Sequence, residues 1–174
     1  MLHRIGGVFL LILVGVLLAY KFSPSRIAPD SKWLTVLDST QLKKEIAEEP
    51  MPLTLVNLWA SWCTPCLKEM PDLIEIKKNY DSKVRFLLIS TDSLEKKSEV
   101  LKILIRQKVD FPTYFKADKG YEELDAIYPN WNGALPANLI LSEKGEVLEA
   151  WFGETTKAQF ENVIEKHLKA LQIQ

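Results

Sequence analysis

Cysteine and histidine are scarce in this sequence, and neither sign of charge is in excess. The only cysteines are Cys63 and Cys66, and the two histidines, His3 and His167, lie near the two ends of the 174-residue chain. A structural zinc site usually needs four ligands from cysteine, histidine or acidic side chains, so two cysteines without a nearby histidine argue against one. The net charge of −1 gives no reason to expect nucleic acid as a partner. We expect no bound metal and no cofactor.

The remaining composition is that of an ordinary globular protein. Hydrophobic residues make up 47% of the chain and charged residues 26%. A chain of 174 residues is long enough for one domain with a proper core and an additional accessory segment.

The accessory segment is an apolar run from Ile5 to Phe22. At 1.5 Å per residue, about 18 helical residues reach roughly 27 Å, which is enough for a thin bilayer. We therefore predict that residues 1–22 form a membrane anchor or signal-anchor and that residues 23–32 form a polar tether. A cleaved signal peptide is the alternative, because its apolar region is about 7–15 residues long and Ser23-Pro24-Ser25 has the small-x-small pattern of a cleavage site.

Apolar strands and amphipathic helices alternate through the rest of the chain, residues 33–174. Strands are expected at residues 33–37, 53–59, 83–90, 110–114, 138–141 and 146–152. Helices are expected from 38 or 39 to 48, from the cysteine pair through 76, from 92 or 93 to about 107, from 121 to 128, and from 155 or 156 to about 171. This order predicts an α/β fold with parallel central strands, to which the final pair of strands adds an antiparallel edge.

Two of these helices have faces that we expect to point into the core. In the helix that starts near residue 93, they are Leu94, Val100, Leu101, Leu104 and Ile105. In the last helix, they are Phe160, Ile164, Leu168 and Leu171.

The chemistry lies in the stretch LTLVNLWASWCTPCLKEMPD, residues 53–72. A buried strand runs through a short loop into a helix, which places both cysteines at the beginning of that helix. The first N–H groups of a helix have no internal partner, and the helix dipole makes its N-terminus positive, so a thiolate is stabilised there. We expect Cys63 to be the more accessible, more acidic and attacking thiol, and Cys66 to be the resolving thiol. On spacing alone, a purely structural disulfide remains the alternative.

The segment Trp62-Cys63-Thr64-Pro65-Cys66, preceded by VNLWAS at residues 56–61, resembles the active site of thioredoxin-like proteins. It is most similar to the membrane-tethered bacterial TlpA/ResA type, which includes reductases that serve cytochrome c maturation. The resemblance covers about residue 33 to the C-terminus. It implies a thioredoxin-like α/β fold, a mixed central sheet flanked by helices, with an N-terminal extension and a central insertion, preceded by one transmembrane helix.

The resemblance also implies a cis-proline next to the cysteine pair, a position that Leu135-Pro136 occupies. We expect Leu135 to offer backbone groups to an extended substrate segment. The residues expected to contact substrate are Trp62, Thr64, Pro65, Leu135 and Pro136.

The predicted activity is thiol–disulfide exchange with partner proteins. Cys63 attacks a partner disulfide, and Cys66 then releases the reduced partner. The resemblance favours reduction of extracytoplasmic proteins, including proteins in cytochrome c maturation, with a membrane electron donor. A single-pass anchor in the cytoplasmic membrane would place the catalytic domain on the periplasmic side, where disulfides persist.

Glu69 and Asn57 are the polar residues next to this motif. Glu69 follows Cys66 by three residues on one helix face, either as a proton acceptor for the thiols or as an ordinary solvated glutamate. The resemblance favours the first role, because an acidic residue often follows the motif there. Asn57 occupies the position of a buried acid in cytosolic thioredoxins. An amide cannot carry a proton, and we expect Asn57 to form a hydrogen bond within its strand.

Two other functions remain open. The thiols could carry a soft ion such as Cu(I), with Met70 as the nearest additional sulfur ligand. A thiol peroxidase on the same fold would need an arginine beside the thiol, and neither Arg85 nor Arg106 lies in a motif that supports this. Metal titration and peroxide consumption distinguish these functions from thiol–disulfide exchange.

Overall fold

The computed structural model describes residues 34–48, 51–117, 122–125, 127–129 and 131–172. The predicted membrane anchor at 1–22 and tether at 23–32 lie outside these residues. Within the described part of the chain, no helix is both long enough and apolar enough to span a bilayer.

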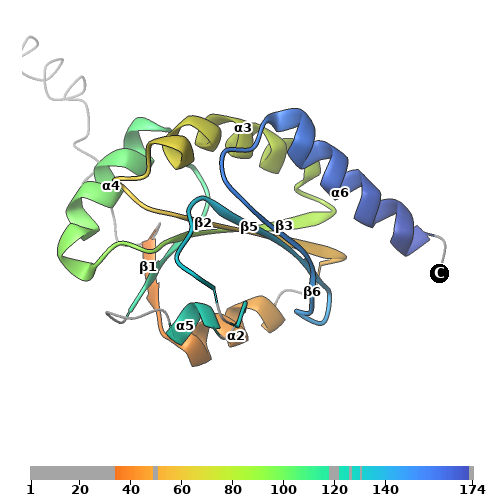
Figure 1. The fold of residues 1–174 in the computed structure, drawn as a ribbon, viewed down its shortest axis with the longest axis horizontal. Helices are drawn as coiled ribbons and strands as arrows, with labels where there is room; N and C mark the ends of the chain where they lie inside the picture. Colours follow the sequence, from red (N-terminus) through yellow and green to blue (C-terminus); the bar gives the residue numbers. More distant parts are fainter. Residues whose placement is uncertain (1–33, 49–50, 118–121, 126, 130, 173–174) are drawn as a thin grey trace, which may run out of the picture. The chain divides into compact units, whose positions relative to one another are not determined.

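The described residues form one six-stranded sheet with helices on both faces (Figure 1). In chain order the elements are β1 Leu34–Leu37, α2 Ser39–Glu48, β2 Leu53–Trp59, α3 Thr64–Tyr80, β3 Val84–Ser90, the 3₁₀ turn η2 Leu94–Lys96, α4 Lys97–Arg106, β4 Thr113–Lys116, α5 Glu122–Asp125, β5 Ala137–Ser142, β6 Val147–Phe152 and α6 Lys157–Gln172.

The strand order β1-β4-β3-β2-β5-β6 places β2 at the centre of the sheet. Strands β1, β4, β3 and β2 are parallel, whereas β5 is antiparallel to β2 and β6 is antiparallel to β5. This confirms the predicted parallel centre with an antiparallel edge. Because β2 and β3 run in the same direction, the loops that follow them meet at one edge of the sheet, where the Thr91 N–H donates to the Trp59 carbonyl at 2.8 Å.

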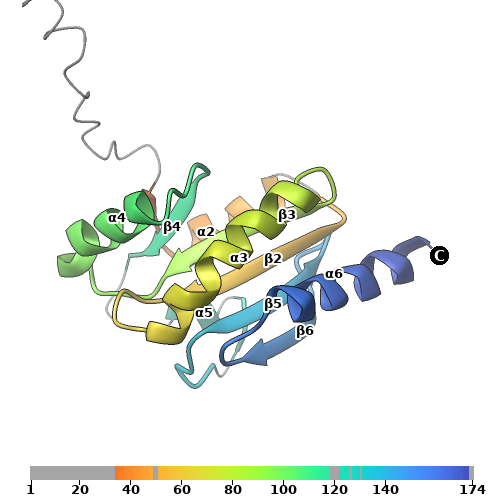
Figure 2. The same cartoon turned by 90° about the horizontal axis from the view of Figure 1, so that it is seen from above.

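The apolar run of β2 is explained by its burial on both faces, since all seven of its residues are buried. Leu53, Leu55 and Trp59 belong to an apolar cluster that includes residues of α3, α4 and α6. Val56 and Leu58 belong to a second cluster that includes residues of α2 and α5. Figure 2 shows α3 lying over the sheet between α4 and α6.

Two predicted helix faces differ from the structure. A 3₁₀ turn precedes α4, and its three residues per turn shift the phase of the chain. Leu94 and Ile105 are therefore 49% and 53% exposed, while Ile103 is buried. Leu171 is 40% exposed, because the last turn of α6 extends past the edge of the sheet (Figure 1).

Candidate active site

Cys63 lies at the beginning of α3, as predicted. It is the N-cap residue, with extended backbone (φ −85°, ψ 94°), and its Sγ accepts a hydrogen bond from the Cys66 N–H at 3.3 Å. The first helical bond follows, from the Leu67 N–H to the Cys63 carbonyl at 3.1 Å. Pro65 lies in the first turn, where its missing N–H leaves no helical bond unmade. The sulfur of Cys63 thus faces the unpaired N–H groups that favour a thiolate.

Cys63 and Cys66 form a disulfide. Cys63 is 4% exposed and Cys66 is 1% exposed, so the predicted order of accessibility is right. In this oxidised form even Cys63 is buried, because both cysteines belong to the apolar cluster that includes residues of α3. They are nevertheless close to the surface, since Trp62 beside Cys63 is 68% exposed.

The predicted substrate-contacting residues lie on two segments. Trp62, Thr64 and Pro65 surround the start of α3, with Trp62 and Thr64 exposed and Pro65 half-buried. The other segment precedes β5, where the Leu135-Pro136 peptide bond is cis, as the resemblance implied. Leu135 is half-buried and packs against the apolar cluster that contains both cysteines. Pro136 is buried, and its carbonyl accepts a hydrogen bond from the Gly153 N–H at 2.9 Å.

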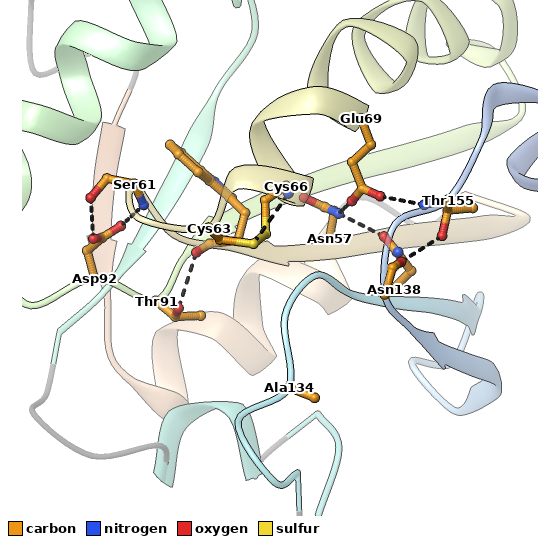
Figure 3. Close-up of a disulfide and its surroundings, with 12 residues drawn as sticks. Asn57, Ser61, Cys63, Cys66, Glu69, Thr91, Asp92, Ala134, Asn138 and Thr155 are labelled. Carbon is orange, nitrogen blue, oxygen red and sulfur yellow. Dashed lines mark hydrogen bonds between the residues drawn. A yellow bond between two sulfur atoms is a disulfide. The ribbon is translucent and has the colours of Figure 1, made fainter.

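Figure 3 places the disulfide between two buried carboxyl groups, Glu69 on one side and Asp92 on the other. Glu69 is 2% exposed, so the interpretation as a solvated glutamate is wrong. Its Oε1 accepts a hydrogen bond from Asn57 Nδ2 at 2.8 Å, and its Oε2 accepts one from the Thr155 N–H at 3.1 Å.

Burial raises the pKa of Glu69 from 4.5 to about 7. Desolvation is the largest cause, because the charged carboxylate loses contact with water. The hydrogen bonds from Thr155 and Asn57 lower the pKa and offset part of this effect, and the nearby charge of Glu154 raises it further. Glu69 therefore changes its protonation state near neutral pH.

Asn57 forms side-chain hydrogen bonds beyond its own strand, whereas we expected bonding only within that strand. Its Nδ2 donates to Glu69 Oε1 and also to Asn138 Oδ1, at 2.8 Å in each case. Asn138 lies directly opposite Asn57 on the neighbouring strand β5. The amide of Asn57 thus connects the two central strands to the carboxyl group of α3, a role that the sequence analysis missed. The only signal was a polar residue inside each of two apolar strands.

Asp92 was also missed, since we expected it or Ser93 to begin a helix. Instead, Asp92 follows β3, is 2% exposed, and accepts hydrogen bonds from the Ser61 N–H at 2.8 Å and the Ser61 hydroxyl at 2.7 Å. The Ser90 hydroxyl also donates to it, at 2.9 Å. Ser61 lies between β2 and Cys63, so this carboxylate holds the loop that leads to the cysteine pair.

The arrangement combines two cysteines at a helix N-terminus with a buried carboxyl group on the same helix, whose pKa is raised to about 7. Among the described residues, no cluster of three or more histidine, cysteine, aspartate or glutamate side chains is placed to hold a metal ion.

Comparison with known proteins gives matches over most of the chain. The AhpC/TSA family matches residues 26–150. The thiol-disulfide oxidoreductase ResA of Bacillus anthracis is 30% identical over 141 residues, which cover 81% of this chain and 78% of that protein. The thioredoxin-like protein YneN of Bacillus subtilis is 26% identical over 172 residues, which cover 92% of this chain and 96% of that protein.

Solved structures show the same fold. StoA from Bacillus subtilis superimposes with a TM-score of 0.54 at 26% identity, covering 66% of this chain and 83% of that chain. A thioredoxin-family thiol:disulfide interchange protein from Chlorobium tepidum gives a TM-score of 0.59 at 22% identity, covering 72% of this chain and 84% of that chain. The chain therefore belongs to the AhpC/TSA family and is a thioredoxin-like thiol–disulfide oxidoreductase with Cys63 and Cys66 as its redox-active pair.

Proposed function

We propose that this oxidoreductase reduces disulfides of partner proteins outside the cytoplasm, with Cys63 attacking, Cys66 resolving and Glu69 accepting the proton of Cys66. The observation that carries the proposal is the buried Glu69 carboxyl group. It lies three residues after Cys66 on α3, and its pKa is raised to about 7.

The first step is attack on the partner. The Cys63 thiolate forms a bond to one sulfur of the partner disulfide, and the other partner sulfur leaves as a thiolate. The product is a mixed disulfide between Cys63 and the partner. The position of Cys63 at the N-cap of α3 supports this role, because the unpaired helix N–H groups stabilise the thiolate that must attack.

The second step needs a proton acceptor, because Cys66 is 1% exposed and its thiol must lose a proton before it attacks. Each oxygen of the ionised Glu69 carboxylate accepts one hydrogen bond and keeps a second lone pair that can take this proton. The Cys66 thiolate then attacks Cys63 Sγ, and the second partner thiolate leaves. Two electrons have passed to the partner, and the disulfide seen in the structure has formed. A pKa near the working pH is what such proton transfer requires.

Substrate contact is assigned to the start of α3 and to the loop before β5. The exposed Trp62 and Thr64, together with Pro65, offer contacts at the start of α3. Leu135 and Pro136 offer contacts on the loop before β5, where the half-buried Leu135 presents backbone to an extended chain.

The location and the partners follow from the TlpA/ResA resemblance and the apolar N-terminus. Residues 1–22 anchor the chain in the cytoplasmic membrane, residues 23–32 form the tether, and the domain at 33–174 faces the periplasmic side. Partner disulfides persist in that compartment. A membrane electron donor returns the Cys63–Cys66 disulfide to the dithiol, and the partners include proteins of cytochrome c maturation.

Trapping in cells tests the exchange mechanism. In Cys66→Ser the mixed disulfide cannot be resolved, so partner proteins should remain covalently attached to Cys63 and can be identified by mass spectrometry. Cys63→Ser is the matched control and should trap none of them. The mechanism is wrong if Cys66→Ser accumulates no mixed disulfides or if both variants trap the same proteins.

Two further measurements test the direction of electron transfer and the role in cytochrome c maturation. A reduction potential well above about −150 mV would contradict the reductant role, because such a pair would oxidise its partners. Cells that carry only Cys63→Ser should lose covalently attached haem and regain it when a small thiol is added. Normal haem attachment in these cells would exclude the cytochrome c role and leave the exchange reaction intact.

The peroxidase and copper alternatives gain no support from the described residues. Arg85, one of two arginines considered for a peroxidase, forms an ion pair with Glu45 of α2 at 2.5 Å. Peroxide consumption and Cu(I) titration of the reduced protein remain the direct tests of these alternatives.

A further inference from the structure

Asp92 is a buried carboxylate that the exchange reaction does not use. It lies just after β3, on the side of the disulfide away from Glu69 (Figure 3). Its two oxygens accept hydrogen bonds from the Ser61 N–H, the Ser61 hydroxyl and the Ser90 hydroxyl, at distances of 2.7 to 2.9 Å. A carboxylate that is only 2% exposed needs hydrogen-bond donors to offset its lost hydration, so these three bonds fix the position of Asp92.

The Ser61 contacts fix the turn that delivers Cys63 to the helix. Ser61 precedes Cys63 by two residues, and the Cys63 N–H donates to the Ala60 carbonyl at 3.1 Å across this turn. Asp92 binds both the backbone and the side chain of Ser61, so the turn has little freedom to rotate. The third contact, from Ser90, ties the same carboxylate to the end of β3.

We propose that Asp92 is a positioning residue that sets the reactivity of Cys63 by holding Ser61. This inference rests on the proposed exchange reaction and adds a residue to it. Within the described part of the chain, the hydrogen bonds to the Asp92 carboxylate come from Ser61 and Ser90, so Asp92 acts on Cys63 through the turn. Its hydrogen bonds keep the sulfur of Cys63 at the N-terminus of α3, where the unpaired N–H groups stabilise the thiolate.

The hydrogen bonds of Asp92 to Ser61 matter more in the dithiol than in the disulfide. In the disulfide, the covalent bond to Cys66 holds Cys63 in place whether or not the turn is fixed. In the dithiol that bond is broken, and the position of Cys63 Sγ at the helix N-terminus depends more strongly on the turn between β2 and α3. Loosening the turn therefore destabilises the reduced thiolate more than the disulfide. The pair becomes harder to reduce, and reduced Cys63 becomes a slower nucleophile.

Ser61→Ala in the full chain tests this with the smallest change, since it removes the hydroxyl bond and keeps the backbone bond to Asp92. We expect its equilibrium with glutathione to shift about tenfold toward the disulfide, which corresponds to about 30 mV. Alkylation of reduced Cys63 by iodoacetamide should slow at least threefold. Asp92→Asn should shift both quantities in the same direction, and Ser61→Thr, which keeps the hydroxyl, should restore both to within twofold of wild type.

Ser142→Ala is the matched control for stability. The Ser142 hydroxyl accepts hydrogen bonds from the N–H groups of Lys144 and Glu146 at the far end of β5, so this variant also loses serine hydrogen bonds. We expect it to lower the unfolding midpoint without changing the glutathione equilibrium or the alkylation rate.

The inference is overturned if Ser61→Ala matches wild type in both redox measurements, or if Ser142→Ala shifts them as much. These measurements concern the cysteine pair itself. A wild-type protein that reduces no protein disulfide would refute the proposed function, while the comparison between Ser61→Ala and Ser142→Ala would still decide the role of Asp92.

Discussion

Replacing Glu69 by glutamine tests the central electrostatic feature of the site, a carboxyl group whose pKa is raised by burial. A rise from 4.5 to about 7, at 1.36 kcal/mol per pH unit, corresponds to about 3 kcal/mol. Because the folded-state pKa lies above the usual value, ionisation of Glu69 destabilises the folded protein. This penalty is absent below about pH 4.5, grows as the pH rises, and is complete above about pH 7.

Glu69→Gln has no such penalty, because the amide stays neutral. It also loses part of a hydrogen bond, since its NH₂ group must face either Asn57 Nδ2 or the Thr155 N–H. That loss is about 1 kcal/mol and does not change with pH. We therefore expect the difference in unfolding free energy, variant minus wild type, to increase by about 3 kcal/mol between pH 4.5 and pH 8.

Urea denaturation of the oxidised protein at several pH values measures this difference. Glu99→Gln is a suitable control, because Glu99 is exposed and pairs with Lys96 at the surface. The difference in unfolding free energy between this variant and wild type should change by no more than about 0.5 kcal/mol over the same pH range. The glutamine variant should also exchange disulfides at least tenfold more slowly at neutral pH, since it lacks the proton acceptor. A difference that changes by less than 1 kcal/mol across this range would show that burial does not set the pKa of Glu69, and the proton-acceptor role would then lose its basis.

Three further variants probe the site and the core. Asn57→Asp puts a second carboxyl group at hydrogen-bond distance from Glu69, so the two carboxyl groups should titrate at a still higher pKa, as measured by NMR. The variant protein should also lose at least about 2 kcal/mol of stability at pH 8. An unchanged titration would contradict the close contact. Trp62→Ala should leave stability within about 0.5 kcal/mol, because Trp62 is 68% exposed, yet slow the reduction of a protein disulfide at least threefold. Equal rates for both proteins would remove Trp62 from the substrate surface. Phe160→Ala deletes a fully buried ring that packs edge-on against Trp151, and we expect a loss of about 3–5 kcal/mol in urea denaturation with an unchanged reduction potential. A loss below 1 kcal/mol would mean that this part of the core is loosely packed.

The fold and the cysteine pair were predictable because their signals are local. The continuous apolar run of β2 reflects burial on both faces of the sheet, and the helical spacing after Cys66 places the pair at the start of α3. Both features need only neighbouring residues, and the resemblance added the cis-proline at position 136, which the structure confirms.

The polar network was not predictable in the same way, because its members meet only after the strands are ordered. Asn57 and Asn138 are 81 residues apart, Glu69 and Thr155 are 86 apart, and Ser61 and Asp92 are 31 apart. The contact between Asn57 and Asn138 depends on the pairing of β2 with β5, and the contact at Asp92 depends on β2 and β3 ending at the same edge. No local pattern distinguishes a buried aspartate from one that caps a helix.

The near-complete enclosure of the two sulfurs has a kinetic consequence. Within the described part of the chain Cys66 is 1% exposed and Cys63 is 4% exposed, so we expect reacting molecules to reach the pair at Cys63. The molecule that supplies electrons and the molecule that receives them must then react at Cys63 one after the other. Because the electron donor and the partner protein cannot occupy this position together, turnover should follow ping-pong kinetics, with parallel lines in double-reciprocal plots.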